Sequence, residues 1–232
     1  MTRVAEAPID PIFLRRWSPR AMSGAPITRD EINALLEAAR WAPSAANFQP
    51  WRFVVALRDT PAFDKFFDLL ADGNKTWCQR AGALVLVTSY TLTDKGQPLR
   101  THAFDTGAAW VSFALQGSMM GLVVHGMGGF DYDRARDVVK LPAGHEVHAM
   151  VAVGHPGNVD DLAEHLRPRE VPNARKHVTE FAFDGEFSEA PKSELAFAPK
   201  RSVQRASRHA ELTRGFTQVA ARGVDRFEHR LA

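Results

Sequence analysis

Three arginines and a serine are concentrated in the six residues 15 to 20, RRWSPR. The guanidinium group of arginine is a planar fork of donors that matches phosphate oxygens, and the hydroxyl of Ser18 adds a short donor. The segment is therefore a candidate phosphate site. A solvated basic turn would contain the same residues.

A second polar segment, PSAANFQPW, spans residues 43 to 51. Asn47 and Gln49 each carry a donor and an acceptor, as needed to bind the edge of a heteroaromatic ring or a sugar hydroxyl. Loops that follow rigid elements commonly carry binding groups. The alternative is that Ser44 and Asn47 only stabilise the turn.

Two later segments could join the same site. GMGGFD, residues 126 to 131, is a glycine-rich turn whose backbone could approach a flat ligand, although its spacing is not that of the dinucleotide fingerprint. RPRE, residues 167 to 170, and RKH, residues 175 to 177, supply basic groups that would close on a phosphate if the chain returns there. A structural turn and a solvated loop are the alternatives.

The sequence contains no motif for metal binding or nucleophilic catalysis. The nine histidines form no metal-binding motif such as HxxxH or HExxH, so we expect no metal site. The one cysteine, Cys78, excludes an intrachain disulfide, and no serine lies in a GxSxG motif.

Helices and strands must position these segments. The capping-box sequence at residues 28 to 31 predicts a helix from 29 to 41, and apolar spacing predicts a second helix from 61 to 71, with a break at 72 to 74. Residues 102 to 120 form a long, small-residue-rich helix suited to a close interface, and 132 to 139 form a short helix. Strands are predicted at 51 to 57, 83 to 90, from 122, and 147 to 154.

The strand at 83 to 90, ALVLVTSY, is apolar at nearly every position, so it should be covered on both faces. Strands separated by helices then indicate an α/β or α+β three-layer sandwich. Residues 1 to 185 should form one domain. Residues 186 to 232, with nine basic and six acidic groups, should form a basic extension that is an arm, a partner-wrapping segment or an exposed helix.

Composition narrows the function classes. With 29 Lys and Arg against 27 Asp and Glu, the chain lacks the basic field that nucleic acid binding requires. No stretch has the length and apolarity of a membrane span or signal peptide, and one cysteine suits a reducing compartment. We therefore expect a cytoplasmic protein without nucleic acid or membrane partners.

Residues 12 to 185 resemble the FMN-dependent nitroreductase family. The resemblance rests on the order and the intervals of RRWSPR, APSAANFQPWRF, the Asn74 region, HGMGGFD, VGHP and the following RPRE and RK. The resemblance implies an α+β, three-layer α-β-α sandwich that forms an interlocked homodimer with FMN at the dimer interface. The flavin carries the chemistry, so no side-chain acid or base and no metal is required.

The resemblance also implies roles for single residues. Arg16, Trp17 (through its backbone), Ser18 and Arg20 contact FMN, and Arg175 and Lys176 complete the phosphate clamp. Asn74 bonds the ring, and Met127, Gly128 and Gly129 lie near its reactive edge. The partner chain supplies Pro43, Ser44, Ala45, Asn47 and Gln49. We also expect a substrate pocket that contains Phe130 and Trp77. Trp77 departs from the family pattern, since it stands where some members carry a lysine, and it would stack near flat aromatic acceptors.

The implied activity is a ping-pong reaction in which NADH or NADPH reduces FMN and a small acceptor, such as a quinone or nitroaromatic, then takes the electrons. Two alternatives stay open. The same scaffold supports specialised flavin reactions, namely dehalogenation, dehydrogenation of a peptide-derived ring or flavin breakdown, and a flavin-binding regulatory protein with little turnover would also fit.

Overall fold

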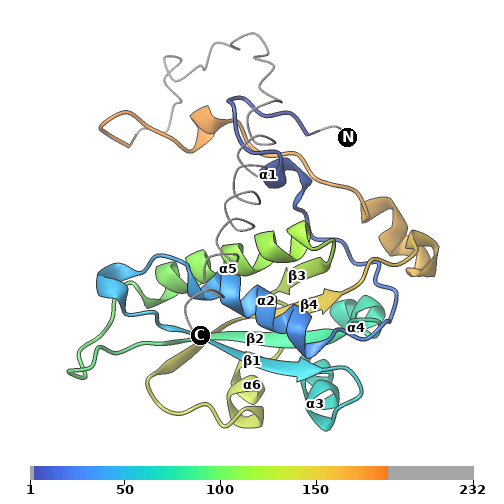
Figure 1. The fold of residues 1–232 in the computed structure, drawn as a ribbon, viewed down its shortest axis with the longest axis horizontal. Helices are drawn as coiled ribbons and strands as arrows, with labels where there is room; N and C mark the ends of the chain where they lie inside the picture. Colours follow the sequence, from blue (N-terminus) through green and yellow to red (C-terminus); the bar gives the residue numbers. More distant parts are fainter. Residues whose placement is uncertain (1–2, 188–232) are drawn as a thin grey trace, which may run out of the picture. The chain divides into compact units, whose positions relative to one another are not determined.

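A computed structural model describes residues 3–187 of the chain (Figure 1). The chain divides into two compact units, residues 1–175 and 176–232. Of the predicted extension from 186 to 232, residues 188 to 232 lie outside the described residues. The elements that follow belong to the first unit, except for a short 3₁₀ turn, η4 (Val178–Glu180).

One four-stranded sheet forms the centre of the first unit. Its strands are β1 (Trp51–Leu57), β2 (Ala83–Tyr90), β3 (Val123–Met127) and β4 (His145–Gly154). They are ordered β1-β2-β4-β3, and each pairing is antiparallel. Helix and strand therefore mix in the manner of the α+β class, and the four predicted strands are confirmed, with β4 beginning two residues earlier than expected.

Helices lie on both faces of this sheet (Figure 1). One face packs against α2 and α5, and the other against α3, α4 and α6. The bounds of these helices are α2 (Arg29–Arg40), α3 (Pro61–Leu69), α4 (Asp72–Cys78), α5 (His102–Met119) and α6 (Tyr132–Val138). The predicted double-sided burial of β2 is confirmed, because seven of its eight residues are buried.

The side chains of β2 point alternately to the two faces of the sheet, so they contribute to two separate apolar cores. Leu84 and Leu86 point to the core beneath α3 and α4, whereas Val85 and Val87 point to the core beneath α2 and α5. Tight packing depends on small residues of α5. A Cβ at Gly117 would lie 2.3 Å from Cγ2 of Val124, so glycine is what lets this helix approach β3.

Local signals explain most helix limits. Thr28 and Glu31 form the predicted capping box of α2. The predicted break at 72 to 74 is wrong, because these residues begin α4 after α3 has ended at Leu69. The carbonyl of Ala71 accepts from the amides of Asn74 and Lys75, so a new helical turn starts where the polar residues indicated a loop.

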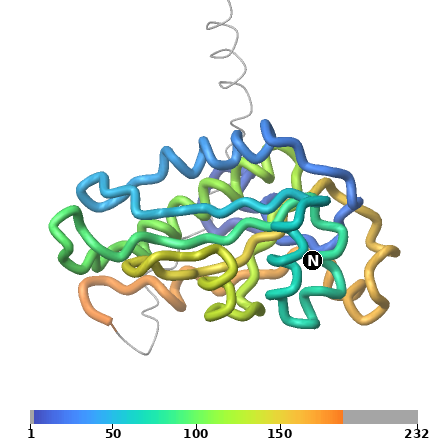
Figure 2. The backbone as a smooth tube through the Cα atoms, turned by 90° about the horizontal axis from the view of Figure 1, so that it is seen from below, coloured from blue at the N-terminus to red at the C-terminus, as the bar shows by residue number. Residues whose placement is uncertain are grey.

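The segments before and after the sheet run side by side. α1 (Ile12–Arg15), the 3₁₀ turn η2 (Val159–Asp161) and the longer 3₁₀ segment η3 (Glu164–Arg169) were not predicted. Met22 forms a β-bridge with Pro156, and the amide of Gly157 donates to the carbonyl of Ala21. Figure 2 follows the blue N-terminal segment and the yellow-orange segment after β4 along this path.

Candidate functional site

A buried carboxylate fixes the arginine segment at residues 15 to 20. Oε1 of Glu170 accepts from the backbone amides of Arg20 at 2.6 Å and Ala21 at 2.8 Å. Oε2 lies 3.8 Å from Nη1 of Arg20, and the Glu170 side chain is 2% exposed. Glu170 therefore joins η3 to the N-terminal segment and holds the Arg20 backbone in place.

Arg3 fastens the same region from a position that no sequence motif marked. Its Nη1 donates to the carbonyls of Leu14 at 3.0 Å and Arg16 at 2.8 Å, and its Nε donates to the carbonyl of Asn173 at 3.0 Å. One guanidinium group thus ties three stretches of backbone together. Arg3 is recognised as a site residue only because it lies close to the other arginines in space, and the sequence does not show this proximity.

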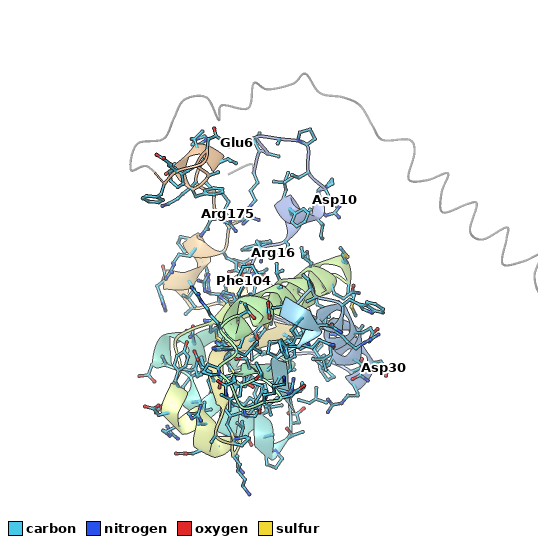
Figure 3. All side chains as sticks on the ribbon, turned by 90° about the vertical axis from the view of Figure 1, so that its left-hand side faces the viewer. Glu6, Asp10, Arg16, Asp30, Phe104 and Arg175 are labelled. Carbon is cyan, nitrogen blue, oxygen red and sulfur yellow. The ribbon has the colours of Figure 1, made fainter. Side chains whose placement is uncertain are left out.

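These segments enclose a cavity of about 450 Å³ whose lining contains five arginines and no acidic residue. The arginines are Arg3, Arg16, Arg20, Arg169 and Arg175. Trp17, Ser18, His125 and Asn173 add polar or aromatic groups to the wall. Figure 3 labels Arg16 and Arg175, which lie near opposite ends of the sequence of this unit. The cavity suits an anion because five guanidinium groups and no carboxylate line it.

The charges in this cavity affect one another. Burial lowers the pKa of Arg16, and the nearby positive charge of Arg175 lowers it further. Arginine nevertheless stays protonated in proteins, so the cavity keeps an excess of positive charge. A bound phosphate would relieve this repulsion.

His125 forms part of the wall, and Trp77 lies behind it. The Nδ1 atom of His125 is 2.8 Å from the carbonyl of Pro19, and its ring centroid lies 4.6 Å from that of Trp77. Burial is the largest effect on His125 and lowers its pKa. Trp77 is 3% exposed and belongs to the core, so a ligand would meet the imidazole of His125 and not the expected indole.

A second cavity of about 530 Å³ adjoins the first, since Arg16 and Ser18 line both. Its wall contains Gly126, Met127 and Gly128 of the predicted glycine-rich turn, together with Trp110 and His148. A Cβ at Gly126 would lie 3.0 Å from the Trp110 ring. The glycine thus lets the indole lie against β3, and an anion site meets a recess with an aromatic wall.

Asn74 and Gly129 contact each other beside the glycine-rich turn. Nδ2 of Asn74 donates to the carbonyl of Gly129 at 2.9 Å, and a Cβ at Gly129 would lie 2.8 Å from that nitrogen. Phe130 follows but is only 8% exposed, and its ring stacks on Tyr132 at 4.1 Å. Phe130 thus packs in the core, where it supports the turn, and not in an open pocket.

The turn at residues 43 to 49 lies elsewhere in the chain and lines neither of these two cavities. The amide of Ala45 donates to the carboxylate of Asp105 at 3.2 Å, and the amide of Gln49 donates to Oγ of Ser44 at 3.1 Å. Ala46, Asn47 and Gln49 have φ values of +47°, +58° and +49°. Non-glycine residues seldom adopt this left-handed region, and such strain often occurs at binding sites.

Within residues 3–187, no group of three His, Cys, Asp or Glu side chains is placed to hold a metal ion. No helix in that range is long and apolar enough to cross a bilayer. Lys176 begins the second compact unit, so its expected contribution to the phosphate clamp stays a prediction.

Comparison with known proteins shows the family. The sequence profile of the nitroreductase family matches residues 14–76. An NADH dehydrogenase of Thermus thermophilus is 30% identical over an alignment of 190 residues that covers 68% of this chain and 90% of that protein. The chain belongs to the nitroreductase family.

Two further relatives of this nitroreductase-family chain extend the comparison. A crystal structure described as an oxidoreductase containing FMN is 42% identical, with a TM-score of 0.78, and the likeness covers 81% of this chain and 97% of that one. An uncharacterized 15.4 kDa protein of Mycolicibacterium smegmatis is 33% identical over 146 residues, 58% of this chain and 95% of that protein.

The family profile does not reach the whole site. It covers the arginine segment, the turn at 43 to 49 and Asn74, whereas Met127, Gly128 and Arg175 lie beyond it. The fold brings Arg175 to the cavity that Arg16 lines, and it brings Met127 and Gly128 to the adjoining one. Arg169 belonged to the predicted basic segment RPRE and His125 to the segment HGMGGFD, although neither was assigned a role. Asn173, Trp110 and His148 carried no sequence signal that marked them as site residues.

Proposed function

We propose that this nitroreductase-family protein binds FMN and uses NADH or NADPH to reduce small oxidised acceptors such as quinones or nitroaromatics. The observation that carries the proposal is the five-arginine cavity joined through Arg16 and Ser18 to the glycine-walled recess. The description of one relative as an oxidoreductase containing FMN and of another as an NADH dehydrogenase supports it.

The residues present fit FMN by their chemistry. A phosphate monoester carries close to two negative charges at neutral pH, and the cavity supplies guanidinium forks without an opposing carboxylate in its lining. Arg16, Ser18, Arg20 and Arg175 would hold the phosphate and the adjoining chain. Met127 and the backbone of Gly128 and Gly129 would border the isoalloxazine ring, with Asn74 keeping Gly129 in place.

Bound FMN would supply hydride chemistry, and the protein would orient it and exclude competing reactions. The nicotinamide donor and the acceptor would use the same recess in turn, which gives ping-pong kinetics. Because Trp77 and Phe130 are buried, the stacking surface for an aromatic acceptor would come from other residues, and Trp110 is the indole that lines the recess.

The turn at residues 43 to 49 would reach the flavin of a second chain in an interlocked homodimer. Pro43, Ser44, Ala45, Asn47 and Gln49 line neither of the two cavities of their own chain. The exposed side of α5 supports dimerisation, since Phe104 is 83% and Val111 45% exposed, and a Cβ at Gly107 would meet no atom within 4 Å. We place this dimer in the cytoplasm, with residues 1 to 185 as its FMN-binding domain.

Visible absorption of the purified protein under anaerobic conditions tests the proposal. The expected result is a flavin spectrum that bleaches when NADH or NADPH is added and returns when menadione is added. A protein that gains no flavin spectrum after incubation with FMN would refute the proposed function. A flavin spectrum that neither nucleotide bleaches would support FMN as the cofactor and refute NADH and NADPH as the electron donors.

A further inference from the structure

His148 occupies an irregular position in the sheet. In the pairing of β2 with β4, Val87 lies opposite Ala149 and Thr88 lies opposite Val147, so His148 is the extra residue between two paired positions. Such a β-bulge redirects a side chain, and bulges are frequent beside active sites. The redirected imidazole of His148 lines the recess that also contains Gly126, Met127 and Gly128.

A buried hydroxyl connects this imidazole to a second one. Oγ of Ser89 lies 2.7 Å from Nε2 of His148 and 2.8 Å from Nδ1 of His102. Ser89 is fully buried, at 0% exposure. A hydroxyl has one proton, so Ser89 donates to one imidazole and accepts from the other. The three groups therefore form one continuous hydrogen-bonded chain from β4 through β2 to α5.

The same two imidazoles face a carboxylate at the surface. Oε2 of Glu146 lies 3.7 Å from Nε2 of His102, and its Oε1 lies 3.9 Å from Nδ1 of His148. The Glu146 side chain is 57% exposed, whereas the two histidine side chains are 17% and 19% exposed. Glu146 therefore lies close to the nitrogen of each imidazole that does not bond to Ser89, and it is in contact with solvent.

Burial and two neighbouring groups act on the pKa of His148. Burial lowers the pKa of His148, Glu146 raises it, and the charge of His102 lowers it. The other charged group that lines the recess is Arg16, and Tyr132 of α6 donates its hydroxyl to the His148 carbonyl. A positive charge on His102 therefore opposes a positive charge on His148.

We propose that His148 is a catalytic proton donor at the recess, and that Ser89 and His102 are positioning residues that fix its orientation and tautomer through the hydrogen bond at Nε2. The inference rests on the proposed flavin oxidoreductase function. A two-electron acceptor such as a quinone gains a hydride from reduced flavin and then needs one proton to become a hydroquinone. That proton comes from His148.

The Nδ1–H bond of the His148 imidazolium breaks as an O–H bond forms on the acceptor, and the negative charge that the hydride left on the acceptor is neutralised. The electron pair of the broken bond stays on Nδ1, so His148 becomes neutral and keeps its Nε2–H, which donates to Oγ of Ser89, while the Ser89 hydroxyl donates to Nδ1 of His102. One solvent proton, entering beside Glu146, then restores Nδ1–H.

The reoxidation of the prereduced FMN-bound protein, followed by anaerobic stopped-flow absorbance, tests this role. We expect His148→Gln to be reoxidised by menadione about 100-fold more slowly than the natural protein, within the range for general acid catalysis. Ferricyanide takes electrons without protons, so its rate should not change. Equal menadione rates in His148→Gln and the natural protein would overturn the proposal, as would an equal loss with both oxidants.

His145→Gln is the matched control, because His145 lies on the same strand, its ring is tilted against that of Tyr90, and its Nδ1 lies 3.3 Å from the carbonyl of Ala143. It should react like the natural protein with both oxidants. Ser89→Ala should slow menadione reduction and change its pH profile. A loss that His145→Gln shares would show a general effect of removing a histidine from β4 and would overturn the assignment.

A measurement on the flavin-free protein separates this inference from the proposed function. Imidazole ¹⁵N resonances should show neutral His148 as the Nε2–H tautomer, and Ser89→Ala should remove this preference. Neutral His148 protonated at Nδ1 in the natural protein would overturn the proposed proton donation even if the flavin chemistry is present. The Nε2–H tautomer in a protein that binds no flavin would retain the hydrogen bond and refute the flavin function on which its use depends.

Discussion

Replacing Glu170 with glutamine tests whether one buried carboxylate organises the anion cavity. Its Oε1 accepts two backbone amides at 2.6 and 2.8 Å, and its Oε2 has no hydrogen-bond partner but lies 3.8 Å from Nη1 of Arg20. Glu170→Gln keeps the shape and one carbonyl acceptor, but it removes the charge. The new amide NH₂ would stand beside the Arg20 guanidinium, where it finds no acceptor.

The expected loss of stability follows from the two hydrogen bonds that backbone amides donate to Glu170. A hydrogen bond to a charged group contributes about 1.5 to 3 kcal/mol and a neutral one about 0.5 to 1.5 kcal/mol, so each bond should weaken by about 1 kcal/mol. The total is about 2 kcal/mol, which for a domain of this size corresponds to a fall in Tm of about 4 to 8 °C. FMN affinity should fall as well, because Arg20 loses its fixed position.

Urea unfolding of the flavin-free protein measures this effect without a contribution from the ligand. Glu37→Gln is the matched control, since Glu37 makes exposed bonds to Arg40 and Trp41 on α2. It should leave the urea midpoint unchanged. If the Glu170→Gln and Glu37→Gln midpoints both equal that of the natural protein, the carboxylate does not hold the segment and the reasoning fails.

Three other predictions concern the cavity and its supports. Arg16→Ala should weaken FMN binding by about 1.5 to 3 kcal/mol, or roughly 10- to 150-fold in Kd, because a charge-assisted phosphate contact is lost; fluorescence titration would measure this, and the neighbouring Arg15→Ala should bind FMN normally. Gly117→Ala should destabilise the protein by about 1 to 3 kcal/mol, because its Cβ would overlap Val124; an unchanged thermal midpoint would contradict that packing. Burial lowers the pKa of His125 in the folded protein, so the unfolded chain binds a proton first below pH about 6.5 and stability is lost as pH falls. His125→Asn should therefore show a smaller decrease in urea midpoint between pH 7.5 and 5.5, and an equal decrease would count against the burial argument.

The sequence predicted the elements whose signals are local. The capping box at Thr28 and the unbroken apolar run of β2 each determine structure within one segment, and both are present as expected. At residues 72 to 74 the local signal failed. Glycine and asparagine indicated a loop, but the carbonyl of Ala71 starts α4 and Asn74 bonds to the distant Gly129.

The cavity itself depends on contacts between residues that are far apart in the sequence. Arg3, Glu170 and Asn173 meet the arginine segment only because the chain returns past it after β4. Sequence spacing indicated Arg16 and Arg175 through a family pattern, yet no periodicity places Arg3 beside them. The bulge that redirects His148 is likewise a property of the pairing between two strands, and neither strand reveals it alone.

The location of Trp77 illustrates a different limit. An aromatic residue near Asn74 suits a flat acceptor, but burial of an indole against an apolar core and an imidazole is also favourable. In the structure the indole of Trp77 is buried, since it is 3% exposed and lies behind His125. Sequence identifies the residue type, whereas its depth follows from how α4 packs on the sheet.

The most direct test of the central claim compares the binding of FMN and riboflavin to the flavin-free protein by equilibrium fluorescence titration. The two ligands share the ring and differ in the phosphate, which the five-arginine cavity would bind. If the phosphate contacts contribute about 3 kcal/mol, FMN should bind roughly 100-fold more tightly than riboflavin. Equal affinity for the two ligands would contradict the assignment of this cavity to the flavin phosphate.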